Sequence, residues 1–144
     1  MPARQAEGVL LDTCALIWIA TAGPMLSSAQ EAVGTASGCG TVFVSVVSAS
    51  DIACFARRRS SRAPGFRPDP KAWFAAVLQG PGIRLAPFTP GTAIDSEPLP
   101  GLPHRAPADR ALIATVRHLG ISLVTRDARI LTDARNGLVQ VIPC

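Results

Sequence analysis

Short apolar runs alternate with amphipathic stretches along the chain. β-Branched and aliphatic residues concentrate at 8–12, 41–45, 83–86, 121–125 and 138–142, and these runs predict strands. The intervening stretches predict helices at 15–20, 27–33, 48–59, 71–78, 92–96 and 109–119. This alternation indicates an α/β fold, in which a central parallel sheet of four or five strands has helices on both faces.

The clearest helix signal lies at 109–119. Leu112, Ile113, Val116 and Leu119 fall on one face there, and Gly120 stops the helix. Between the other elements, residues 34–40 read as a Gly-rich turn and residues 87–107 as a Pro-rich stretch. We assign no helix between Asp127 and the last strand.

The composition fits one domain over residues 1–144. With 48% hydrophobic residues, a chain of 144 residues builds a core without disulfides. The apolar stretch from Val9 to Ala20 is short and is interrupted by Asp12, so neither a signal peptide nor a membrane span is expected. We expect a cytoplasmic protein.

Cysteine and charge usage agree with that compartment. The four cysteines form no CxxC pair, and we expect each to pack as a small hydrophobe in a reducing environment. The net charge is +4, and Lys71 is the one lysine, so nearly all the cations are arginines, whose planar fork suits phosphate. This balance is compatible with an RNA partner.

Four of the ten acidic residues fall at predicted element ends: Asp12 after the first strand, Asp51 and Asp109 near helix starts, and Asp127 after the fourth strand. Ligands of open α/β sheets bind at the carboxyl ends of strands. A right-handed crossover places strands one and four side by side. We therefore expect the four acids to share one crevice.

Clustered carboxylates repel one another unless a cation neutralises them, and a set of oxygen ligands suits Mg²⁺ or Mn²⁺. No His or Cys spacing indicates zinc. Each acid also has a purely structural interpretation. Asp51 and Asp109 could be helix-cap or dipole partners, and Asp12 and Asp127 could be turn residues. The joint pattern favours a shared site over four separate structural roles.

Three strings resemble motifs of one known family. Residues 10–18 read LLDTCALIW, which is similar to the LLDTHALLW opening of PIN domains in the VapC toxin group. Residues 104–114 read HRAPADRALIA and resemble the HRDPADRLLIA segment of that group, and residues 123–127 read LVTRD, as in the group. Order and spacing also agree, and the resemblance covers about Val9 to Ile142.

The resemblance implies a PIN-like α/β/α sandwich, a Mg²⁺ or Mn²⁺ site and a homodimer. It further implies an endoribonuclease that acts as the toxin of a type II toxin–antitoxin system, with RNA as substrate and an antitoxin as partner. Residue by residue, Asp12, Asp109 and Asp127 match the metal-binding acids of the family. Metal-activated water would hydrolyse the phosphodiester bond.

Two departures concern auxiliary acids. Residues 48–53 read SASDIA where the family commonly has SxWEIA, so Ser50 replaces Trp and the shorter Asp51 replaces Glu. Ala106 stands where the HRDPADR segment has an acid. We therefore assign Asp51 a catalytic role as an outer ligand or water-positioning base, and Ala106 puts a second metal in question.

The rival interpretation is a PIN-like chain that has lost catalysis and binds RNA or protein, which Asp51 and Ala106 favour. Retention of Asp12, Asp109 and Asp127 favours the enzyme, because buried like charges are costly without a cation. A haloacid-dehalogenase phosphatase would need an acid at the position of Cys14.

Four neighbours of the acids have two interpretations each. Thr13 and Thr125 either hydrogen-bond a carboxylate or simply finish a strand. Arg110 and Arg126 either balance the acids and hold a scissile phosphate, or form surface ion pairs.

Overall fold

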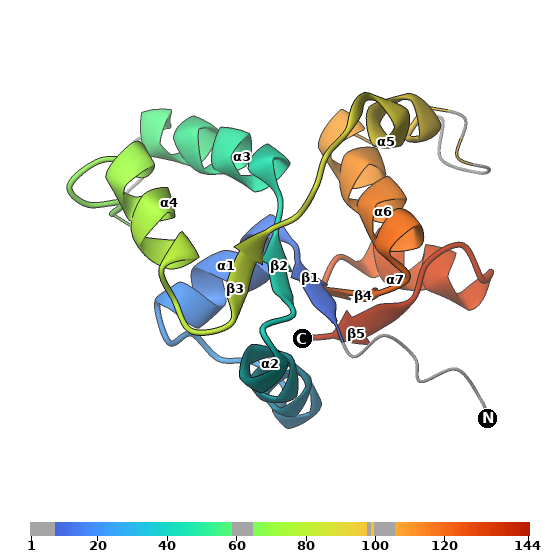
Figure 1. Cartoon of the computed structure of the whole chain (residues 1–144), viewed down its shortest axis with the longest axis horizontal. Coiled ribbons are helices and arrows are strands. Elements are labelled where there is room, and N and C mark those ends of the chain that lie inside the picture. The colour runs from blue at the N-terminus through green and yellow to red at the C-terminus, as the bar shows by residue number, and fades with distance from the viewer. Residues whose placement is uncertain (1–7, 59–64, 98, 100–105) are drawn as a thin grey trace.

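Five parallel strands form one sheet in the order β3-β2-β1-β4-β5. The structure is a computed structural model that describes residues 8–58, 65–97, 99 and 106–144 (Figure 1). The strands are β1 (Val9–Leu11), β2 (Val42–Val44), β3 (Ile83–Leu85), β4 (Ser122–Thr125) and β5 (Val141–Pro143). β1 lies between β2 and β4, which confirms the predicted adjacency of the first and fourth strands.

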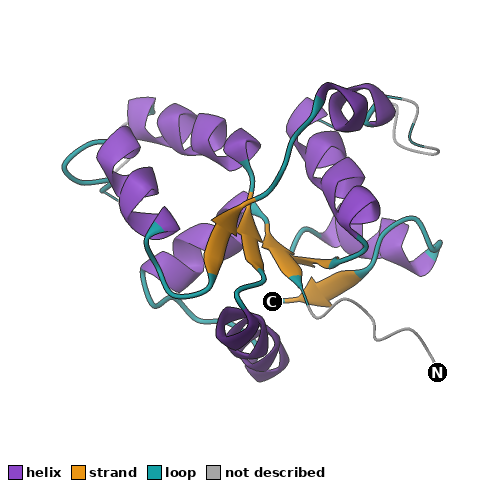
Figure 2. Ribbon diagram, viewed as in Figure 1, coloured by secondary structure: helices purple, strands orange, loops and turns teal. Residues whose placement is uncertain are grey.

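Helices cover both faces of this sheet, as predicted. In the described ranges they are α1 (Thr13–Ala20), α2 (Ser27–Cys39), α3 (Val46–Arg57), α4 (Pro70–Leu78), α5 (Pro90–Asp95), α6 (Pro107–Leu119) and α7 (Ala128–Arg135). In Figures 1 and 2, α3 and α4 lie to the left of the strands, and α5 and α6 lie to the right. The architecture is an α/β/α sandwich.

The alternation of side chains along β1 divides the interior into two cores. Val9 and Leu11 belong to one cluster, with side chains from α1 to α4. Leu10 belongs to the other cluster, with Ile113 of α6 and Ile130 of α7. Successive residues of a strand point to opposite faces, so β1 requires three apolar residues in a row because helices cover both faces.

The predicted Gly-rich turn at 34–40 is wrong for most of its length. Helix α2 continues through Gly34 and Gly38 and ends at Cys39, and only Gly40 takes the left-handed conformation, with φ 69°. Ala29 and Ala36 of α2 are fully buried. Packing of this small-residue face against the core outweighs the low helix propensity of glycine.

Helix α7 is absent from the sequence prediction. Asp127 begins it as the N-cap, accepting hydrogen bonds from the backbone of Arg129 and Ile130. The buried Ile130 and the N-cap at Asp127 are the signals that could have identified it.

Other element boundaries also differ from the prediction. Helix α3 begins at Val46 with Ser45 as its cap, and not at Ser48, while Arg59 at its predicted end lies outside the described residues. β5 spans Val141–Pro143, so Leu138 belongs to the preceding loop. Element ends depend on cap geometry, which the apolar pattern does not record.

The cysteines do not all pack as small hydrophobes. Cys144 is buried and Cys54 is half-buried, but Cys14 and Cys39 are exposed. Among the helices that the structure describes, none combines the length and the hydropathy that a bilayer span requires.

Two glycines with positive φ make a matched test of the packing between α2 and β3. A Cβ on Gly82 (φ 73°) would overlap the backbone carbonyl of Ser37, whereas a Cβ on Gly120 (φ 66°) would meet no atom within 4 Å. Gly120→Ala should lower the free energy of unfolding by about 1 kcal/mol, the cost of the left-handed backbone. Gly82→Ala should cost about 1–3 kcal/mol more because the backbone must shift. Urea denaturation measures both, and equal losses would contradict the tight packing at Gly82.

Candidate active site

A cavity of about 220 Å³ contains all four predicted acids in its lining. Its lining residues in the described part of the chain are Asp12, Thr13, Cys14, Asp51, Phe55, Asp109, Leu112, Arg126, Asp127 and Ile130. Asp12 directly follows β1, and Asp127 lies two residues after the end of β4. The carboxyl edge of the parallel sheet therefore forms the floor of the site.

Asp12 connects β1, α1 and β4. Its Oδ1 accepts a hydrogen bond from the Ala15 backbone at 2.7 Å, which caps α1. Its Oδ2 accepts a hydrogen bond from the Thr125 hydroxyl at 2.5 Å. The backbone N–H of Asp127 donates in turn to Thr125 Oγ1 at 3.1 Å. The hydroxyl of Thr125 thus fixes both acids, which confirms its predicted bond to a carboxylate.

Thr13 performs the same task for Asp51. Its Oγ1 donates to Asp51 Oδ2 at 2.7 Å and lies 3.0 Å from the hydroxyl of the buried Ser48. Asp51 lies one turn into α3, so this contact ties α3 to the start of α1. The predicted hydrogen bond between Thr13 and a carboxylate is confirmed. Ser48 lies within α3 and does not cap it.

Asp109 and Asp127 lie at the starts of two helices. Asp109 is in the first turn of α6, where the backbone N–H groups and the helix dipole favour negative charge. Ala106 is the N-cap of α6 and makes no side-chain cap hydrogen bond. Asp127 caps α7 through Oδ1. His104 and Arg105 of the second motif lie outside the described residues.

Burial raises the pKa of the Asp12 carboxyl above its ordinary value. The hydrogen bonds from Thr125 and Ala15 oppose this shift, the negative charge of Asp127 adds to it, and the positive charge of Arg126 opposes it. Burial also raises the pKa of the Cys14 thiol, and the charge of Asp12 adds to that shift. Without a bound cation, the fold therefore disfavours the ionised form of Asp12.

The donor set fits a hard divalent cation. Carboxylate oxygens are the ligands that Mg²⁺ and Mn²⁺ prefer, and a cation would offset the cost of burying ionised Asp12. Within the described ranges, no three Asp, Glu, His or Cys side chains lie close enough together to hold one metal ion.

The two arginines next to the acids have different surroundings. Arg110 forms an ion pair with Glu97 (Nη2 to Oε1, 3.1 Å) and does not belong to the described lining of the cavity. Arg126 lines the cavity. The ion-pair interpretation therefore holds for Arg110. For Arg126, which lines the cavity, the interpretation as a charge that balances the acids or holds a phosphate stays open.

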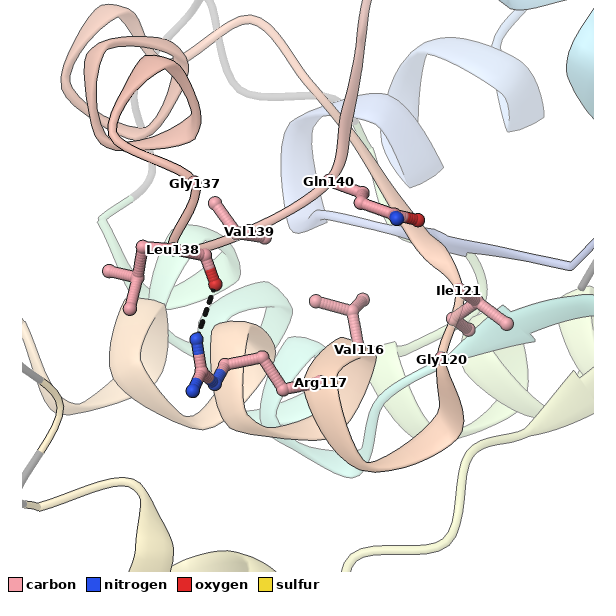
Figure 3. Close-up of a pocket in the computed structure, with 8 residues that line it drawn as sticks. All are labelled: Val116, Arg117, Gly120, Ile121, Gly137, Leu138, Val139 and Gln140. Atoms are coloured by element: carbon pink, nitrogen blue, oxygen red, sulfur yellow. Dashed lines mark hydrogen bonds between the residues drawn. The ribbon is translucent and has the colours of Figure 1, made fainter. Parts of the chain in front are cut away.

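A second cavity, of about 270 Å³, lies at the other edge of the sheet (Figure 3). Gly120 and Ile121 precede β4 there, and Gln140 precedes β5. No acidic residue lines it among the described residues, and Arg117 points to the Leu138 carbonyl and donates to it at 2.6 Å. Although this cavity is larger, its lining offers no group for acid–base or metal chemistry.

Fold and acidic cavity together define an α/β protein with a carboxylate site at the carboxyl edge of its sheet. The PIN domain family matches residues 9–135, and the chain belongs to this family. PIN domains are generally nucleases, and these nucleases typically use divalent metals. A comparison with curated protein sequences found no match.

Solved structures share the fold. The chain is similar to VapBC2 from Rickettsia felis bound to a DNA fragment from their promoter, with a TM-score of 0.66 and 12% identity over 94% of this chain and 97% of that one. It is also similar to FitAB bound to the IR36 DNA fragment, with a TM-score of 0.57 and 16% identity over 94% of each chain. These likenesses confirm the PIN-like sandwich that the motifs implied.

Replacing Asp12 tests the cost of its buried charge. Because the folded-state pKa is raised above the unfolded value, the ionised carboxylate opposes folding at neutral pH. This opposition is lost as the pH falls through the folded-state pKa. In EDTA at neutral pH, Asp12→Asn should therefore unfold at a higher urea concentration than the wild type, and the difference should narrow in acid.

Asp69→Asn is the matched control, because Asp69 is an exposed N-cap that accepts a hydrogen bond from the Ala72 backbone in the same way. Asn caps a helix about as well as Asp, so this variant should change stability by only a few tenths of a kcal/mol. A loss of stability in Asp12→Asn that exceeds the loss in Asp69→Asn would contradict the charge argument.

Proposed function

We propose that the chain is a Mg²⁺- or Mn²⁺-dependent endoribonuclease and the toxin of a type II toxin–antitoxin pair. The observation that carries the proposal is the cavity lined by Asp12, Asp51, Asp109 and Asp127. Membership of a family whose domains are generally nucleases supports it. We expect the protein to act in the cytoplasm, on RNA.

In this proposal Asp12, Asp109 and Asp127 are the metal ligands. A bound Mg²⁺ or Mn²⁺ supplies positive charge at the scissile phosphate and lowers the pKa of water. Thr125 holds Asp12 in one rotamer and Ala15 holds its other oxygen, so its carboxylate is oriented before any ligand binds.

Asp51 is the outer acid of the set. Thr13 fixes its Oδ2, and we assign to this carboxylate the proton that the attacking water gives up. The water oxygen bonds to phosphorus, the bond from phosphorus to the leaving sugar oxygen breaks, and this oxygen takes up a proton from solvent water.

We further propose a homodimer and an inhibitory antitoxin as partner. Support comes from the fold that the chain shares with VapBC2 and FitAB, whose structures are complexes bound to DNA fragments. The sequence motifs that resemble the VapC group support the same assignment.

Cleavage of total RNA by purified, antitoxin-free protein tests the activity. We expect discrete fragments with Mg²⁺ or Mn²⁺, and none with EDTA. Asp109→Asn should lower the cleavage rate by at least about 100-fold because it removes a ligand, and Thr13→Val by about 10-fold because it releases Asp51. Asp69→Asn, outside the described lining of the cavity, should cleave like the wild type.

The rival function is a catalytically inactive PIN-like module that binds RNA or protein, which Ala106 and the separation of the acids favour. Intact RNA in both metals, with RNA or protein binding retained, would establish this rival and overturn the nuclease. Cleavage by Asp109→Asn at the wild-type rate would instead point to a contaminating ribonuclease.

A further inference from the structure

Arg126 is the one cationic side chain among the described residues that line the acidic cavity. It follows β4 and lies between Thr125, which binds Asp12, and Asp127, which caps α7. A phosphate that enters this cavity meets four carboxylates, and its negative charge is repelled by each of them. Within the described lining, only Arg126 attracts it.

The guanidinium is held in place from outside the acid cluster. Its central carbon lies 3.6 Å from the centroid of the Trp18 ring. Its Nη2 donates to the Pro24 carbonyl at 3.1 Å. The face of the aromatic ring attracts the cation, and the flat ring fixes the plane of the guanidinium.

Arg126 forms no ion pair with an acid in the part of the chain that the structure describes. Among the described residues, no acidic side chain lies within ion-pair distance of Arg126, whereas Arg110 is paired with Glu97. A guanidinium has five N–H donors, and its contact to Pro24 uses only part of them. A planar fork with donors to spare matches the oxygens of a phosphate.

We propose that Arg126 binds a backbone phosphate of RNA and holds it against the acid cluster, with Trp18 as the positioning residue that sets the plane of the guanidinium. This inference rests on the proposed function, because it assumes that the acidic cavity receives an RNA strand. It distinguishes Arg126 from Arg110, whose guanidinium is paired with Glu97.

Binding of a short fluorescein-labelled oligouridylate, measured by anisotropy in EDTA across a range of salt concentrations, tests the phosphate contact. Arg126→Ala should weaken binding about tenfold, as expected for a charge-assisted contact. It should also reduce the slope of log K against log salt by about 0.7, the contribution of one phosphate on a single strand. Arg135→Ala removes an equal charge from the exposed end of α7 and should change neither value.

Two further variants separate geometry from charge. Arg126→Lys should keep the salt slope and still bind several-fold more weakly, because it loses the fork. Trp18→Leu keeps apolar volume and removes the aromatic face, so it should raise the KM for cleavage several-fold while kcat changes little. Urea unfolding identifies any variant that is destabilised. If Trp18→Leu proves destabilised, Arg126→Ala, at an exposed position, still tests the proposal.

The outcomes separate this inference from the nuclease assignment. The phosphate contact would be overturned, even if the protein cleaves RNA, by either of two results. One is that Arg126→Ala binds the oligouridylate and has a KM like the wild type, and the other is that Arg135→Ala loses as much binding affinity as Arg126→Ala. Absence of cleavage by the wild type would remove the nuclease assignment, while the loss of binding and of salt slope in EDTA would still establish Arg126 as a phosphate ligand.

Discussion

The hydrogen bond from Thr125 to Asp12 joins two strand ends that are 113 residues apart in the chain, and the arrangement of the site depends on it. It forms because β1 and β4 are parallel neighbours, so both carboxyl ends open on the same edge of the sheet. Helices α1 and α7 begin at this edge, with Asp12 and Asp127 as their N-caps. One pairing of strands therefore brings two carboxylates and two positive helix ends together.

The acids that we propose as metal ligands also have structural roles. Asp12 caps α1 with one oxygen and meets Thr125 with the other, while Asp127 caps α7. Backbone N–H groups at helix N-termini stabilise negative charge, which offsets part of the cost of burying it. An Asp in such a position can remain ionised beside other acids, so capping prepares the carboxylates for a cation.

The sequence is informative where local pattern and chemistry coincide. All five strands were found because each carries a short apolar run, and those of β1, β2 and β4 are buried on both faces. The shared cavity of the four acids was predicted because Asp12 and Asp127 follow β1 and β4, while Asp51 and Asp109 lie near helix starts. Helix α2 through Gly34 and Gly38 was not found, since its stability comes from tertiary packing of Ala29 and Ala36. The different surroundings of Arg110 and Arg126 could not be read from adjacent positions, because contacts with Glu97 and Trp18 arise only in the fold.

The anchoring of Arg126 explains how a cation can border a carboxylate site without disabling it. An arginine paired with Asp12 or Asp127 would occupy oxygens that a metal ion needs, and its own charge would be consumed. Trp18 and the Pro24 carbonyl instead hold the guanidinium by its face and one edge. The positive charge of Arg126 still acts on Asp12 and lowers the pKa of its carboxyl. The carboxylate oxygens nevertheless stay available to a metal ion. In the proposed function, separate anchors for the acids and the arginine would let one cavity bind a metal ion and a phosphate side by side.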